Sequence, residues 1–139
     1  MPSVSAVVIN PRRELLLQFR EDNAWWGIPG GSVEIGESVT AAVVREVNEE
    51  TGLQVEVSRL VGVYSDPANY ALASYPGGAV VHHINLCFAC RAIGGELSGS
   101  EEGLEIGYYP LDNLPQPLLL SHKIRLNDAL QEQAEAFIR

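Results

Sequence analysis

The chain has 139 residues, the length of one ordinary domain, and 46% of them are hydrophobic, which is enough to build a buried core. The formal net charge of −9 excludes the broad basic surface that binding of a nucleic acid polymer usually requires. The sequence has neither the pattern of a signal peptide nor an apolar stretch long enough to cross a bilayer, so we expect a single cytoplasmic domain over residues 1–139 with no membrane partner.

Strand-like segments dominate the beginning of the chain. Residues 4–9 and 14–20 are rich in apolar side chains, which predicts two strands joined by the turn at Asn10–Pro11. Residues 25–36 combine glycines, a proline and two tryptophans, a composition that excludes a regular helix. We therefore expect two strands followed by an irregular, glycine-rich loop.

A helix is predicted over residues 38–51, which contain neither glycine nor proline and are rich in helix formers. Ser38 is suited to the N-cap position, and Gly52 is suited to end the helix. Residues 53–64 then alternate in polarity and are rich in β-branched side chains, which predicts the next strand.

The second half of the chain is predicted to contain further strands. Residues 79–93 form a long strand-like segment that ends in a turn at Gly94–Gly95, and residues 105–109 form a short strand. Two proline-containing segments, 66–78 and 110–117, are predicted to be loops.

The end of the chain is predicted to be an amphipathic helix. Its apolar residues recur at helical spacing. Together with the strands, this helix predicts an α/β protein with one mixed sheet flanked by at least two helices. The recurring apolar residues are Leu126, Leu130, Ala134 and Phe137.

Two pairs of reactive side chains lie in the strand-like segment 79–93. Cys87 and Cys90 are three residues apart, which places them on opposite faces of a strand, and a redox or zinc role would need partners that the sequence does not supply. Buried, reduced cysteines are therefore expected. His82 and His83 also point to opposite faces, and one of the two is expected to point inward.

Three glutamates share one face of the predicted helix. Glu46, Glu49 and Glu50 stand at positions i, i+3 and i+4, where like charges repel one another and acids at a helix C-terminus oppose the helix dipole. One interpretation is a solvated acidic face. The other is a site for a hard cation such as Mg²⁺, which takes several oxygen ligands and would remove the repulsion.

The surrounding residues decide between these interpretations. Gly31 is followed by five residues, Glu37, seven residues and then the run from Arg45 to Leu53, and every defining position of this pattern resembles the Nudix box. The residues from Trp26 to Gly31 also resemble the segment that leads into that box. The resemblance implies the Nudix fold, an α/β/α sandwich with a mixed β-sheet. It also implies hydrolysis of a nucleoside diphosphate linked to another moiety, with Mg²⁺ or Mn²⁺ as cofactor.

Residue roles follow from this resemblance. Glu46, Glu49 and Glu50 are expected to bind the metal, with Glu50 as the first choice for a direct ligand, and Glu37 is expected to bind it through water or to orient the cluster. Arg45 is expected to pair with a carboxylate and fix its rotamer. The alternative for Arg45 is an exposed surface arginine.

Catalysis also needs a base to take the proton of the attacking water. The base lies in the box in some relatives, where Glu46 and Glu49 are candidates, and in a later loop in others. Glu102 fits the second position, with an acidic turn as the alternative. Arg20 is expected to meet a substrate phosphate, and Gly31 belongs to the tight turn at the site. Tyr109, among other aromatic residues, is expected to stack on a base, although core packing is the more common role. The other aromatic candidates are Trp25, Tyr64 and Tyr70.

Substrates differ within such a family, and several remain open. Pro67 lies fourteen residues after Leu53, near the spacing associated with ADP-ribose enzymes, which favours ADP-ribose or a nucleotide sugar. The alternatives are a nucleoside triphosphate pyrophosphohydrolase and a nucleotide-binding module without activity, and the retained box glutamates disfavour the module. The expected partner is a small nucleotide, and the resemblance is compatible with a homodimer.

Overall fold

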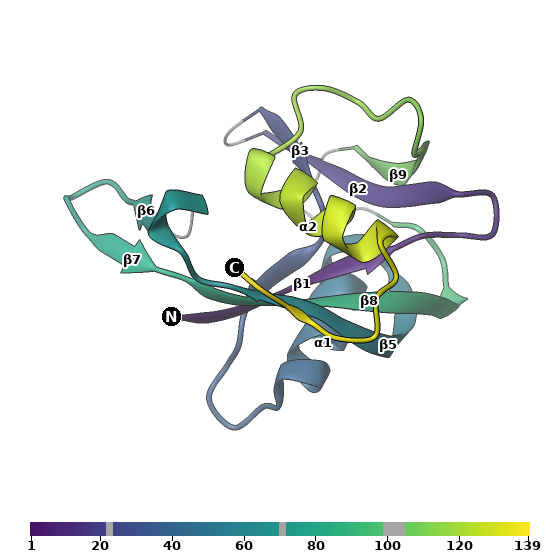
Figure 1. Cartoon of the computed structure of the whole chain (residues 1–139). Helices are drawn as coiled ribbons and strands as arrows, with labels where there is room; N and C mark the ends of the chain where they lie inside the picture. Colours follow the sequence, from purple (N-terminus) through teal and green to yellow (C-terminus); the bar gives the residue numbers. More distant parts are fainter. Residues whose placement is uncertain (22–23, 70–71, 99–104) are drawn as a thin grey trace.

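The computed structural model describes residues 1–21, 24–69, 72–98 and 105–139, and these fold into two helices and a set of strands (Figure 1). A short 3-10 turn also covers Pro67–Asn69. The elements in chain order are β1 (Pro2–Val8), β2 (Glu14–Arg20), β3 (Trp25–Gly27), β4 (Gly30–Ser32), α1 (Val39–Thr51), β5 (Leu53–Tyr64), β6 (Leu72–Ser74), β7 (Val80–His82), β8 (Ile84–Gly95), β9 (Ile106–Pro110), α2 (Leu120–Leu130) and β10 (Phe137–Ile138).

The central sheet is mixed, as predicted. It has five strands in the order β10-β5-β8-β1-β4, in which β1 and β8 run parallel while β5 and β8 run antiparallel. A second sheet has the order β3-β2-β9, and β6 pairs with β7 in a separate hairpin that projects from the body of the molecule (Figure 1).

The two helices cover opposite faces of the strands, with α2 above and α1 below in Figure 1. Val4 and Val8 of β1 pack in the same core cluster as α1, whereas Val7 packs in the cluster that contains residues of α2. This alternation gives the predicted α/β/α arrangement. Cys87 and Cys90 are both buried and free, and they belong to different clusters, so their opposite placement is also confirmed.

The ends of α1 agree with the sequence prediction. The Ala41 N–H donates to Ser38 Oγ at 3.1 Å, so Ser38 is the N-cap. Gly52 ends the helix with a φ of 80°, and its N–H donates to the Asn48 carbonyl. Val43 and Val47 are fully buried against the sheet, and Glu50 of the last turn also reaches the strands, whereas Glu49 is exposed.

The C-terminal helix is shorter than predicted. It ends at Leu130, and Ala134 and Phe137, which were assigned to it, lie beyond its end. Phe137 instead begins β10, which pairs parallel with β5. Ladder hydrogen bonds along β5 therefore override the helical spacing, because tertiary contacts dominate weak local preferences.

The long strand predicted over residues 79–93 is also different. It breaks at His83 into β7 and β8, and β8 continues through Gly94 and Gly95, which were predicted to form a turn. Pairing with the start of β5 extends β8 to Gly95, because Leu53 lies opposite Gly95.

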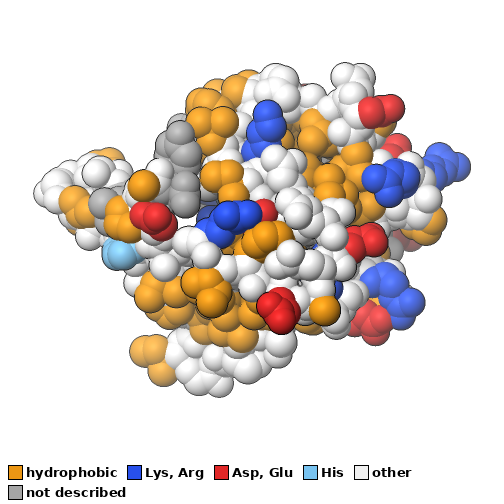
Figure 2. All heavy atoms as spheres, viewed as in Figure 1, with side chains coloured by type: hydrophobic (Ala, Val, Ile, Leu, Met, Phe, Trp, Pro, Cys, Tyr) orange, Lys and Arg blue, Asp and Glu red, His pale blue; other side chains and the backbone are white. Residues whose placement is uncertain are grey.

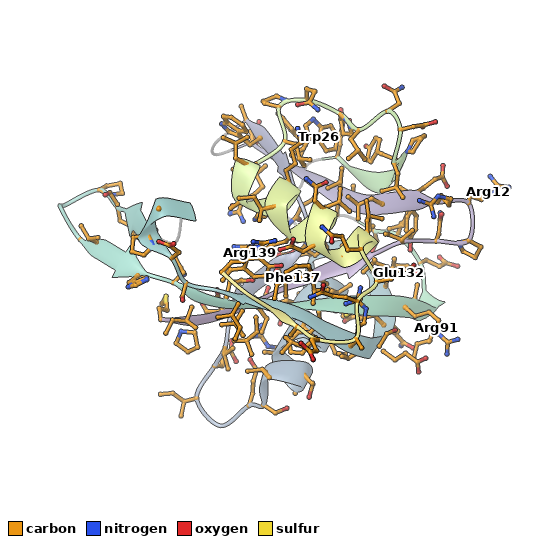
Figure 3. The ribbon with its side chains drawn as sticks, in the orientation of Figure 1. Arg12, Trp26, Arg91, Glu132, Phe137 and Arg139 are labelled. Carbon is orange, nitrogen blue, oxygen red and sulfur yellow. The ribbon has the colours of Figure 1, made fainter. Side chains whose placement is uncertain are left out.

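A buried polar network ties α2 and the last strand to β5. Tyr64 donates its hydroxyl hydrogen to Asp128 at 2.9 Å, and Arg139 binds both carboxylate oxygens of Asp128 at 2.8 and 3.0 Å. The Arg139 guanidinium also lies 4.7 Å from the centre of the Phe137 ring, and both residues lie beside α2 in Figure 3. Charge-assisted hydrogen bonds of this kind anchor α2 over the sheet.

The surface carries charges of both signs. Figure 2 shows basic and acidic side chains interspersed with apolar ones over the face that α2 covers. Within the parts of the chain that the structure describes, no helix has the length and apolar character needed to span a membrane.

Gly52 and Gly36 offer a matched test of how the helix end is fixed. Both have positive φ, 80° and 87°, but a side chain at Gly52 would meet the Glu96 carbonyl and Ser98, whereas nothing lies near Gly36. We expect Gly36→Ala to lower the free energy of unfolding by about 1 kcal/mol, from left-handed strain alone. We expect Gly52→Ala to lower it by about 2 kcal/mol or more, because the clash is added. Urea unfolding measures both, and equal losses would contradict the assigned packing.

Candidate active site

The Arg45 guanidinium joins three of the glutamates that the sequence singled out. Its Nε and Nη2 donate to the two Glu37 oxygens at 3.0 and 2.7 Å. Its Nη1 donates to Glu46 at 3.0 Å and to Glu49 at 3.2 Å, and Nη2 also reaches the Ser32 carbonyl. Arg45 therefore fixes the orientation of carboxylates on the helix and in the loop before it.

Glu37 is the partner that Arg45 holds most firmly. The bidentate pair with Arg45, together with the Glu34 N–H that donates at 3.0 Å, lowers the pKa of Glu37 to about 2. Pairing with Glu37, and to a smaller extent with Glu46, raises the pKa of Arg45. Glu37 thus stays ionised through the whole range in which most proteins are folded.

Glu46 packs against the glycine-rich loop. Its side chain is 15% exposed, and burial raises its pKa, against the opposing effect of Arg45. A Cβ at Gly31 would collide with the Glu46 carboxylate. Gly31, predicted from the sequence as a binding residue, therefore lies at the site, where it leaves room for a carboxylate.

Glu50 is held from the other side by the sheet. Its Oε2 accepts hydrogen bonds from Gln18 Nε2 at 2.9 Å and from the Gly30 N–H at 3.1 Å. Burial raises the pKa of Glu50 to about 7, and the neighbouring Glu46 carboxylate adds to the shift. A buried carboxylate beside a second carboxylate is unfavourable unless a cation is near.

The remaining predicted residues lie at different distances from this cluster. Arg20 ends β2 close enough to Glu50 for its charge to lower the pKa of that carboxyl. Tyr109 packs edge-on against Trp26, with ring centroids 5.0 Å apart, on the side of the core that faces α2. Its contact is the core packing named as the alternative, and its binding role stays a prediction. Glu102 and Tyr70 lie outside the described residues.

The sequence motif did not predict three groups that lie at or near the site. Gln18 shares a strand face with buried Leu16, and only the folded pairing brings it to Glu50. The Gly30 N–H is a backbone group. His122 of α2 donates nothing to the cluster but accepts a hydrogen bond from the Ile28 N–H at 2.9 Å, two residues before Gly30.

The donor set fits a hard divalent cation. Glu46, Glu49 and Glu50 offer carboxylate oxygens, the ligands that Mg²⁺ prefers. Gly31 leaves room for the Glu46 carboxylate, and the buried Glu50 carboxylate gains from nearby positive charge. The fit is one of ligand chemistry, because among the residues with described positions no three His, Cys, Asp or Glu side chains are arranged so that they could hold a metal ion. Arg45 holds part of the set instead.

Comparisons with known proteins agree on the family to which the chain is related. The model of the NUDIX domain family matches residues 1–130. An ADP-ribose pyrophosphatase from Methanocaldococcus jannaschii is 39% identical over 127 residues, which is 89% of this chain and 70% of the relative. A MutT-like protein from Streptomyces ambofaciens is 35% identical over 92% of this chain and 75% of its own length. The crystal structure of an ADP-ribose pyrophosphatase from Streptococcus suis is 28% identical, with a TM-score of 0.73 over 99% of this chain and 96% of that one.

The Glu37–Arg45 pair predicts a pH-dependent contribution to stability. Because folding lowers the pKa of Glu37 from 4.5 to about 2, the contribution is fully present above the unfolded value and is lost as the pH falls through this interval. We expect Glu37→Gln to destabilise the protein at neutral pH and the difference from wild type to shrink below about pH 4.5.

Urea unfolding over a range of pH measures this difference. Glu56→Gln is a matched control, because Glu56 pairs with Arg91 on an exposed part of the sheet and surface pairs contribute little. A difference for Glu37→Gln that is constant from neutral to acid pH would contradict the assigned pairing.

Proposed function

The chain belongs to the Nudix hydrolase family, and from that premise we propose that it is a divalent-metal-dependent pyrophosphohydrolase with Glu46, Glu49 and Glu50 as its metal-binding carboxylates. Members of this family hydrolyse phosphoanhydride bonds in small nucleotides. The observation that carries the metal assignment is the burial of Glu50 beside Glu46 at the end of a helix that repels negative charge.

The excess of carboxylates at this point supports the proposed binding of a cation. Glu37 takes two of the Arg45 donors and the Ser32 carbonyl takes another contact, so Arg45 neutralises the cluster only in part. Mg²⁺ or Mn²⁺ held by the helix glutamates would supply positive charge to neutralise the phosphoryl oxygens of a bound diphosphate.

The residues of the chain then divide the remaining work. Arg45 fixes the rotamers of Glu46 and Glu49, and Glu37 holds Arg45 in place. Gln18 and the Gly30 N–H orient Glu50.

Two further residues complete the proposed chemistry. Arg20, at the end of β2 near Glu50, is proposed to bind a substrate phosphate. Glu102 is proposed to accept the proton of the attacking water, since a carboxylate base is required and the groups on α1 are engaged with Arg45 or buried. Glu46 and Glu49 are the alternative bases within the helix.

The proposed substrate is a nucleoside diphosphate linked to another moiety, with ADP-ribose first. The Methanocaldococcus jannaschii relative and the Streptococcus suis structure are named ADP-ribose pyrophosphatases, and Pro67 stands near the spacing associated with that activity. The MutT-like name of the Streptomyces relative supports nucleoside triphosphates as the second candidate.

Removing one oxygen ligand tests the enzyme assignment. We expect Glu50→Gln to lower kcat/KM at least about 100-fold with Mg²⁺, because the carboxylate charge is lost while its shape is kept. We expect EDTA to abolish wild-type activity and added Mg²⁺ or Mn²⁺ to restore it. Monophosphate release from a panel of nucleoside diphosphate derivatives and triphosphates is the measurement, with Glu56→Gln as the control. Tight nucleotide binding by wild type without any hydrolysis would overturn the proposal in favour of a binding module.

A second pair of variants tests the base. Glu101 and Glu102 are adjacent acids, and the family resemblance selects Glu102. We expect Glu102→Gln to lower kcat by about 100-fold or more and to leave KM nearly unchanged, while Glu101→Gln retains most activity. Equal effects of the two substitutions would contradict this role of Glu102 and favour Glu46 or Glu49 as the base.

A further inference from the structure

His122 touches the glycine-rich loop from the side opposite α1. It lies in the first turns of α2, and its Nδ1 accepts the Ile28 N–H at 2.9 Å. Because the backbone group is the donor, Nδ1 carries no proton and the ring is neutral with its hydrogen on Nε2. Burial, assisted by the charge of Arg125, lowers the pKa of His122 to about 3 and so preserves this acceptor.

The fit between His122 and the loop is close. A Cβ at Gly27 would lie 2.7 Å from His122 Nδ1, so only glycine permits the ring to reach Ile28. Two backbone bonds reinforce the contact, since the Trp26 N–H donates to the Pro117 carbonyl at 2.8 Å and the Leu119 N–H donates to the Trp26 carbonyl at 3.0 Å. Figure 3 shows Trp26 beside the segment that leads into α2.

The same loop reaches Glu50 two residues later. Pro29 follows Ile28, is fully buried, and its carbonyl accepts the Ala6 N–H at 2.9 Å. Gly30 then donates its N–H to Glu50 Oε2 at 3.1 Å. Proline restricts its own φ and the conformation of the residue before it, so the path from Ile28 to Gly30 is stiff.

We propose that His122 is a positioning residue, which holds Ile28 so that the Gly30 N–H stays aligned with the Glu50 carboxylate on the other face of the sheet. The structural link does not depend on the reaction. Its consequence for catalysis rests on the proposed function, in which Glu50 binds the metal. Groups that orient metal-binding residues commonly change activity 10- to 100-fold when they are removed.

Two substitutions at one position separate the hydrogen bond from the bulk of the ring. Asparagine can present its Oδ1 near the place of Nδ1, whereas leucine fills similar space without an acceptor. We expect His122→Leu to lower kcat about 10-fold with little change in KM for ADP-ribose, and His122→Asn to retain most of the wild-type kcat. Leu126→Val is the matched control, because Leu126 is buried on the same helix in the core beneath it. We expect this control to lower Tm and to leave kcat unchanged.

The Gly30 amide provides a readout that needs no activity. In ¹H–¹⁵N spectra of the folded protein without metal, we expect His122→Leu to shift the Gly30 resonance and speed its hydrogen exchange. His122→Asn and Leu126→Val should leave it near the wild-type position. An unchanged Gly30 amide in His122→Leu overturns the proposal, and so does an equal loss of kcat in the asparagine and leucine variants. If wild type proves inactive, the proposed function fails, and the Gly30 amide still decides whether His122 positions this loop.

Discussion

The concentration of negative charge at the end of α1 is the constraint on which the other features of the site depend. Glu46, Glu49 and Glu50 stand where the helix dipole disfavours them, and Arg45 holds only part of that charge. The helix tolerates them because Val43 and Val47 on its apolar face are fully buried and its two ends are capped. Burial of that face contributes more than like-charge repulsion of a few tenths of a kcal/mol per pair removes. The fold thereby keeps acids in place that local preferences would exclude.

The glycine-rich segment from Gly27 to Gly31, which joins β3 to β4, also constrains the site, because three neighbours approach its backbone. Gly27 meets His122, Gly30 meets β1 at Val4 and Ser5, and Gly31 meets the Glu46 carboxylate. A side chain at any one would push a different element away. The loop is therefore the part through which α2, the central sheet and α1 are fitted to one another, and the site inherits its precision from packing on both faces.

The sequence specified the local parts of this arrangement well. Ser38 and Gly52 give α1 its limits, because capping depends on groups within a few residues. Alternating polarity in the first half of β5 and β-branched residues along it predict the strand from Leu53 to Tyr64. The spacing of the motif predicted that Arg45 and the glutamates lie close together. Non-local partners had no such signal. Phe137 has helical spacing in the sequence but pairs with β5 as part of β10. Strand pairing brings Gln18 to Glu50, and the position of α2 brings His122 to Ile28.

Charge also bears on how a substrate would enter. A nucleoside diphosphate is itself an anion, and the α1 carboxylates together with a net charge of −9 repel it. Arg20 alone does not balance this repulsion, because one surface guanidinium contributes little in water. Binding of the cation and of the phosphates is therefore expected to be cooperative, each lowering the electrostatic cost of the other. Under the proposed function, selectivity among nucleotides then has to come from contacts with the base and sugar, because the cluster on α1 recognises only the charge and oxygens that all such substrates share.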